Sequence, residues 1–143
     1  MGTTAKANET LVRNFVETVK NKRELGRLGE FFTSDYVEHN EVVASFGKSI
    51  EGYQRFLSHL FEAYPDDTVT IEQLVASDDW VAYRASETGT NKGTFLDIPA
   101  TGKRATWTEI QFFRIANGKI VEHWVDVDFY SWMEQLGLIP KQG

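Results

Sequence analysis

Residues 105–129 read ATWTEIQFFRIANGKIVEHWVDVDF. Two runs rich in β-branched and aromatic residues, 105–115 and 119–129, lie on either side of Asn117-Gly118. Asn-Gly between two such runs is the strongest short-range signal for a tight β-hairpin. We therefore predict two long antiparallel strands joined by this turn.

Upstream of the hairpin, periodicity predicts helices and strands that are segregated along the chain. Apolar residues recur at helical spacing over 8–20, 22–32 and from Ser49, which can cap the third helix, to Pro65. A short strand is expected at 36–40, longer strands at 68–76 and 80–90, and a last short helix at 130–136 before Gly137. This order predicts an α+β fold of one domain, 1–143, with helices on one face of a curved, mostly antiparallel sheet.

Composition restricts the classes of function. The chain has 143 residues and a formal net charge of −6, which argues against a nucleic-acid partner. It has no cysteine, so thiolate nucleophiles and cysteine-ligated metals are excluded. No apolar run reaches the roughly 20 residues of a membrane-spanning helix, and the N-terminus lacks the apolar stretch of a signal peptide. We expect a cytoplasmic protein without a membrane partner.

Aromatic residues are numerous, with ten Phe, five Tyr and four Trp. This number suits a cavity lined by rings, and it also suits an aromatic core without a cavity.

Side chains alternate between the two faces of a strand, so each strand of the hairpin has two sets of side chains, one on each face. One face of the first strand carries Trp107, Glu109, Gln111 and Phe113. On the second strand, one face carries Glu122, Trp124, Asp126 and Asp128, and the other carries Val121, His123, Val125, Val127 and Phe129. Either set of the second strand can face the interior, and a bulge near Asp126 would exchange them.

The carboxylates of these strands are the candidate proton-transfer groups. A carboxyl beside indole rings and other acids has its pKa raised by desolvation and like charge, which suits acid/base chemistry near neutral pH. The alternative is a solvated acidic face without chemistry. Trp124 distinguishes the two: if it faces inward, Asp128 is the first candidate, and if His123 faces inward, the chemistry proposed for this strand is withdrawn.

The three histidines do not form a metal-binding motif. His39 can reach a pocket mouth or make a structural hydrogen bond, and His59 lies at the edge of an apolar helix stripe. We expect no metal ion. A Gly-x-Ser-x-Gly elbow is also absent, which argues against a serine hydrolase.

Several segments resemble the SnoaL-like polyketide cyclases and the related ester cyclases, which belong to the NTF2-like superfamily. They are YVEHN (36–40), AYPD (63–66), GTFLDIPATGK (93–103), FRIANGKIVEHW (113–124) and QLGLIP (135–140), in this order over nearly the whole chain. The resemblance implies a cone-shaped α+β domain with a pocket between helices and sheet, and a homodimer.

The resemblance also implies a reaction. Polyketide cyclases of this family close a ring by intramolecular aldol condensation without a metal or organic cofactor. Their catalytic aspartate corresponds to Asp128, with Asp126 as the alternative if a bulge intervenes. The positions of their polar partners correspond to His39, Asn40, Glu109 and Gln111.

Three functions remain open from the sequence. The first is cyclase or isomerase chemistry on a small hydrophobic carbonyl compound, with the substrate held by Trp107, Trp124, Tyr36, Tyr53, Phe56 and Leu60. The second is water activation of the epoxide-hydrolase type, for which Arg84 would have to lie in the pocket. The third is non-catalytic binding of a hydrophobic ligand, or a role as a dimerisation module, which requires every pocket carboxylate to be paired in a salt bridge.

Overall fold

The computed structural model describes residues 3–141. Its helical segments are α1 (Thr3–Phe15), the π-helical turn η1 (Val16–Asn21), the 3-10 turn η2 (Leu25–Glu30), α2 (Glu41–Ala44), α3 (Ser49–Ala63) and α4 (Phe129–Gln135). Its strands are β1 (Phe32–Glu38), β2 (Thr68–Ala76), β3 (Trp80–Thr90), β4 (Arg104–Ala116) and β5 (Lys119–Val127). No helix among these residues is long and apolar enough to cross a membrane.

The strands form one sheet in the order β1-β5-β4-β3-β2. β1 runs parallel to β5, and the other pairs are antiparallel. The predicted hairpin is confirmed as β4 and β5. Asn117 and Gly118 both have positive φ, 51° and 74°, which is what a type I′ turn requires.

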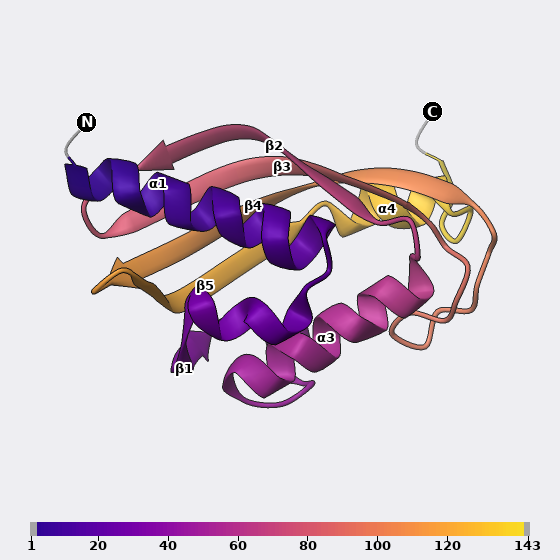
Figure 1. Cartoon of the computed structure of the whole chain (residues 1–143). Coiled ribbons are helices and arrows are strands. Elements are labelled where there is room, and N and C mark those ends of the chain that lie inside the picture. The colour runs from indigo at the N-terminus through magenta and orange to yellow at the C-terminus, as the bar shows by residue number, and fades with distance from the viewer. Residues whose placement is uncertain (1–2, 142–143) are drawn as a thin grey trace.

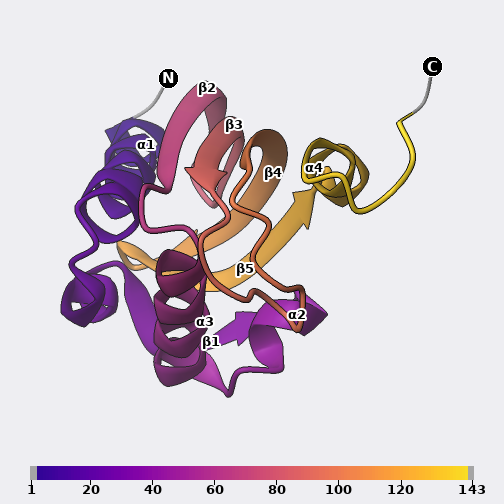
Figure 2. The same cartoon turned by 90° about the vertical axis from the view of Figure 1, so that its right-hand side faces the viewer.

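Helices α1 and α3 lie on one face of the strongly curved sheet, as Figures 1 and 2 show. α1 crosses β2 and β3, and α3 packs near β1. α4 lies beyond the end of β5 and contacts β4 (Figure 2). The predicted α+β class, with helices on a curved and mostly antiparallel sheet, is confirmed. The core between the layers is aromatic and includes Phe15, Phe32 and Phe113.

Several predicted boundaries differ from the observed ones. The second predicted helix, 22–32, is only the turn η2, because Gly26 and Gly29 give it little helical propensity and residues from Phe32 onward pair with β5. The short helix α2 occupies part of a predicted loop. Ser49 does not cap α3: Lys48 is the N-cap residue, and no side chain makes the capping bond.

Candidate active site

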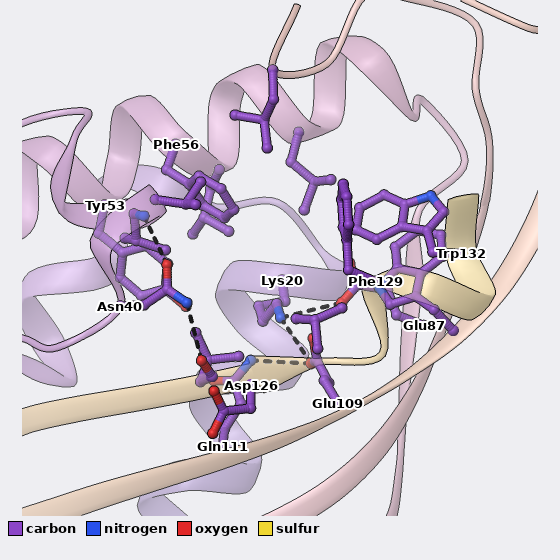
Figure 3. Close-up of a pocket in the computed structure, with 18 of the residues that line it drawn as sticks. Lys20, Asn40, Tyr53, Phe56, Glu87, Glu109, Gln111, Asp126, Phe129 and Trp132 are labelled. Carbon is purple, nitrogen blue, oxygen red and sulfur yellow. Dashed lines mark hydrogen bonds and ion pairs between the residues drawn. The ribbon is translucent and has the colours of Figure 1, made fainter. Parts of the chain in front are cut away.

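A cavity of about 370 Å³ lies between α3 and the concave face of the sheet. Figure 3 shows side chains from helices and strands converging on it. Its apolar walls are Val42, Val43, Tyr53, Phe56, Leu57, Leu60, Phe95, Leu96, Trp107, Val125, Val127, Phe129 and Trp132. Its polar lining is Lys20, Asn40, Glu87, Glu109, Gln111, His123 and Asp126. The cavity is therefore an apolar chamber with a small number of polar groups, as ligand sites commonly are.

Helix α4 closes one end of this chamber. Its Trp132 stacks on Trp107 of β4 with ring centroids 3.8 Å apart and planes 4° apart. The indole N–H of Trp132 donates to the hydroxyl of Tyr64 at 2.9 Å, so the buried polar atom has a partner. These contacts fix a flat aromatic wall.

The charged centre of the cavity is Lys20 between two glutamates. The Lys20 Nζ lies 3.4 Å from Glu87 Oε1 and 3.4 Å from Glu109 Oε1, and all three side chains are buried. Figure 3 shows the three groups together, with Trp132 and Phe129 on one side. Two carboxyls thus share a single ammonium group.

Burial governs the protonation of this group. Desolvation raises the pKa of Glu109 to about 7 and that of Glu87 to about 8, although Lys20 acts in the opposite direction on both. For Glu87, the nearby Asp67 carboxyl raises the pKa further. The pKa of Lys20 is well above its usual value: burial lowers it, but the two glutamates more than offset this. Burial thus favours the protonated form of both carboxyls, and the two carboxyls favour the charged form of Lys20.

Gln111 and His123 extend the polar network away from Lys20. Gln111 Nε2 donates to Glu109 Oε1 at 3.0 Å, and Gln111 Oε1 lies 2.7 Å from His123 Nε2. On the other side of the ring, His123 Nδ1 lies 2.7 Å from Glu38 Oε1. A continuous line of hydrogen-bonded groups therefore runs from β1 through β5 and β4 to Lys20.

The cavity brings together some of the predicted catalytic residues. Glu109 and Gln111 lie on the inner face of β4, and Asn40 lies at the N-terminus of α2. The Asn40 side chain accepts from Val43 N–H and donates to Val125 C=O, both at 3.0 Å, so it fixes α2 against β5. Asp126 is exposed and contributes to the cavity lining from β5.

Two predicted catalytic residues lie outside the cavity lining. Asp128 is the N-cap residue of α4, and its carboxylate accepts from Ser131 N–H at 3.1 Å. His39 is 2.7 Å from Glu122 and stacks on Trp124, with ring centroids 4.3 Å apart. Both side chains have structural partners where they are.

The prediction that Trp124 faces the substrate pocket is wrong. His123 is fully buried and faces inward, because Phe113 and Gln111 on the inner face of β4 pair with His123 and Val125. Trp124 lies on the outer face, where its indole is covered by His39, Trp80 and Phe112 rather than by a cavity. This parity also removes the case for Asp128 as the proton-transfer group.

Among the predicted substrate-binding residues, Trp107, Tyr53, Phe56 and Leu60 line the cavity. Tyr36 does not. It is buried behind the wall, and its hydroxyl donates to Glu38 Oε1 at 3.0 Å.

Sequence reasoning missed Lys20, Glu87 and the inward position of His123. Lys20 follows Val12 and Val16 at four-residue spacing, so a lysine within the apolar stripe of a helix was an available signal. Glu87 alternates with the buried residues Ala85 and Gly89 of β3, so it too was a charged residue on an apolar face.

The water-activation alternative required Arg84 in the pocket, and Arg84 is not among the residues that line the cavity. Arg84 is exposed, and its guanidinium donates to Gln73 of the neighbouring strand at 3.4 Å. It points away from the face that carries Tyr83 and Ala85, which are buried.

One wall of the cavity depends on His59. The ring Nε2 of His59 accepts from Leu96 N–H at 3.0 Å, and the ring stacks on Phe95 with centroids 5.2 Å apart. Leu96 and Asp97 have φ of 50° and 64°, a strained conformation for residues with side chains. His59 therefore holds a strained loop against the cavity.

Replacing His59 with Phe keeps the stacking and removes the acceptor. We expect hydrogen exchange at the Leu96 amide to accelerate by roughly fivefold, since a net hydrogen bond contributes about 1 kcal/mol. The Lys92 amide, which donates to Ala63 C=O at 2.9 Å, is the internal control and should not change. Equal acceleration at both amides would mean that His59 does not act on Leu96 specifically.

Comparisons with known proteins agree with this architecture. DauD, the aklanonic acid methyl ester cyclase of Streptomyces sp. (strain C5), is 27% identical over 134 residues, which are 89% of this chain and 80% of DauD. DnrD, the enzyme of the same name from Streptomyces peucetius, is also 27% identical, over 89% of this chain and 88% of its own. The solved structure of TsrD from Streptomyces laurentii superposes with a TM-score of 0.85 at 25% identity and covers 94% of this chain and 97% of its own.

The family model described as SnoaL-like polyketide cyclase matches residues 10–136, nearly the whole described chain. The match includes every element from the second half of α1 to α4, and thus all residues of the cavity. The chain belongs to the SnoaL-like polyketide cyclase family.

Proposed function

We propose that this protein catalyses proton transfer next to a carbonyl group, as in aldol cyclisation or isomerisation, on a small hydrophobic compound and without a cofactor. The observation that carries the proposal is the pair of buried glutamates that share one lysine inside an apolar cavity. The two carboxyls outnumber the single cation at this apolar wall. Such an arrangement suits a general base that works near neutral pH.

Glu109 is the proton-transfer group in this proposal. Its ionised carboxylate takes a proton from the carbon next to the substrate carbonyl, and the electron pair moves onto the carbonyl oxygen. The resulting enolate carbon attacks a second carbonyl of the same molecule, and Glu109 returns the proton to the new alkoxide. Lys20, which also lines the cavity, supplies a fixed positive charge for the developing oxyanion.

The substrate class follows from the walls and from the relatives. The Trp107–Trp132 stack gives the cavity a flat aromatic side that suits a planar ring system. DauD and DnrD are named for a methyl ester substrate, and we propose a polyketide-like aromatic ester or ketone for this chain too.

Deuterium exchange tests the function before the natural substrate is known. Aromatic β-keto esters are incubated in D2O with the protein, and mass spectrometry follows exchange at the carbon between the two carbonyls. We expect the wild-type protein to accelerate exchange above the buffer rate. Saturable binding of these esters without accelerated exchange would instead support the non-catalytic ligand-binding alternative.

We also propose that the protein forms a homodimer through the outer face of the sheet. An aromatic patch there consists of Trp80, Phe112 and Trp124, with ring centroids 5.2 to 6.0 Å apart. Trp80 is 37% and Phe112 42% exposed, and Ile110 beside them is 56% exposed. Contiguous exposed apolar surface of this kind is typical of association surfaces.

The cytoplasmic location stays a prediction.

Replacing Phe112 with Lys should convert a dimer to a monomer, because a second copy would bury the new charge unpaired. Sedimentation velocity at one fixed protein concentration measures the change. Leu138→Lys, an exposed residue in the segment that follows α4 and lies outside the sheet, is the control for surface charge and should leave the dimer intact. A monomeric wild type would contradict the proposal.

A further inference from the structure

The line of groups from Glu38 to Glu109 constrains where protons can reside. Each nitrogen of the His123 ring faces an oxygen: Nδ1 lies 2.7 Å from Glu38 Oε1 and Nε2 lies 2.7 Å from Gln111 Oε1. Both oxygens are acceptors, so both ring nitrogens must carry a proton for the two hydrogen bonds to exist. With this orientation of Gln111 and with Glu38 as a carboxylate, the two bonds are made by the doubly protonated ring.

The orientation of the Gln111 amide is linked to the protonation of Glu109. Gln111 Nε2 donates to Glu109 Oε1 at 3.0 Å, a bond that is strongest when Glu109 is ionised. If Glu109 Oε1 carries a proton that is directed at Gln111, Gln111 must present its amide oxygen to it and its NH2 group to His123. The Nε2 of His123 must then be unprotonated to accept. The same heavy-atom positions accommodate both arrangements.

We propose that Glu38 and His123 are positioning residues that hold Glu109 as a carboxylate through the amide of Gln111, because a proton of His123 Nε2 and a proton of Glu109 Oε1 cannot both be directed at Gln111. This inference rests on the proposed role of Glu109 as the base. Reversal of the Gln111 amide moves no heavy group in or out of the cavity. It exchanges a donor for an acceptor beside the reacting carboxyl.

Glu38 determines which arrangement prevails. Its carboxylate accepts from His123 Nδ1, from the hydroxyl of Tyr36 at 3.0 Å and from Asn40 N–H at 3.1 Å, and its side chain is only 5% exposed. Hydrogen bonds from these donors favour a carboxylate at Glu38, and a carboxylate there stabilises the doubly protonated ring of His123. Glu38 therefore favours the state in which Glu109 is ionised and ready to accept a proton.

Other charged or titratable groups face the two ends of this line. Glu109 faces Lys20 from η1, Glu87 and Tyr83 from β3, and Asp67 from the segment before β2. His123 faces Glu38 from β1 and the stacked ring of Tyr53 from α3, with centroids 5.4 Å apart. Lys20 and Glu87 act on Glu109 directly, whereas Glu38 has no contact with it and acts only through His123 and Gln111.

Nuclear magnetic resonance of the full chain can detect where these protons reside in the absence of substrate and catalysis. Nitrogen-15 shifts of the histidine rings report the protonation of each ring nitrogen, and carbon-13 shifts of the side-chain carboxyls report the titration of Glu109. We expect both nitrogens of His123 to carry protons at pH 7 in the wild-type protein. A neutral His123 at pH 7 would overturn the proposal, and this measurement needs no substitution.

Glu38→Gln removes the negative charge and keeps the shape. We expect His123 to lose its Nε2 proton at pH 7 and the midpoint of the Glu109 titration to move upward by about one pH unit, a tenfold change in the protonation equilibrium. In a Gln111→Met background, which lacks the amide, the same E38Q change should no longer move the Glu109 titration. A Glu109 titration that is unaltered by E38Q, or equally altered with and without Gln111, would overturn the proposal.

A matched control lies on the outer face of the sheet. Glu122 pairs with His39 at 2.7 Å, as Glu38 pairs with His123, but its side chain is 22% exposed and no amide connects this pair to Glu109. Glu122→Gln should leave the Glu109 titration unchanged. Because these readouts do not depend on catalysis, the inference and the proposed function can fail independently.

Discussion

Replacing Glu109 with Gln should reduce catalysed deuterium exchange by about 10²–10⁴-fold, the usual contribution of a positioned general base. Gln has nearly the same shape, and its amide oxygen can still accept from Gln111 and Lys20, which lie 3.0 and 3.4 Å from Glu109 Oε1 in the wild type. It cannot take a proton from carbon at neutral pH. Exchange is measured by mass spectrometry, and the binding of the same β-keto ester by calorimetry, where we expect a change of less than tenfold.

Asp128→Asn is the control that separates the two candidate carboxyls. Asn remains a good helix N-cap residue, so the bond from Ser131 N–H persists and α4 stays in place. We expect exchange within about twofold of the wild type, because Asp128 is not part of the cavity lining. The opposite result, with exchange lost in D128N and retained in E109Q, would refute the role of Glu109 and restore the role implied by the family resemblance.

Replacing Lys20 with Met should destabilise the protein by about 3–5 kcal/mol at neutral pH, since it leaves buried carboxyls without their cation. Urea unfolding, followed by tryptophan fluorescence, measures the loss. Lys22→Met, an exposed lysine two residues further along the chain, is the matched control and should change stability by less than about 0.5 kcal/mol. A similar loss in both variants would show that Lys20 has no special electrostatic role.

The loss caused by K20M should depend on pH in a defined direction. Without Lys20, which lowers the pKa of both Glu87 and Glu109, those pKa values rise above about 8 and about 7, whereas unfolded glutamates keep the ordinary value of 4.5. The folded variant then holds protons that the unfolded chain releases, so its stability falls as the pH rises from 4.5 through 8. We expect a smaller loss at pH 5 than at pH 8, and a partial recovery of stability at pH 8 in K20M/E87Q.

Several features of the fold were predictable because they depend on local chemistry. Asn117-Gly118 favours a type I′ turn by itself, since both residues accept positive φ. Strict alternation then placed Trp107, Glu109 and Gln111 on one face of β4, which is the face that lines the cavity. The family resemblance added the position of the pocket between helices and sheet.

The second predicted helix shows the limit of local propensity. Its apolar spacing fits a helix, but Gly26 and Gly29 leave only a 3-10 turn, and Phe32 at its end pairs with Ile120 of β5, a strand nearly ninety residues later in the chain. Tertiary pairing of this kind overrides a weak helical preference, and periodicity within a window contains no information about a distant partner.

By itself, the sequence determined the α+β class, the β4–β5 hairpin and the inner face of β4, because turn chemistry and alternation are properties of neighbouring residues. Only the tertiary structure decided which face of β5 is inside, since both faces of 119–127 carry apolar and polar side chains and the hydrophobic pattern alone is ambiguous. It also decided that Lys20, Glu87 and Glu109 meet, because their contact depends on the packing of η1 against the curved sheet. Of the carboxylates of 122–128, which first suggested chemistry, Glu122 pairs with His39, Asp126 lines the cavity from an exposed position, and Asp128 caps α4. The buried carboxylates lie on the neighbouring strands, Glu109 on β4 and Glu87 on β3.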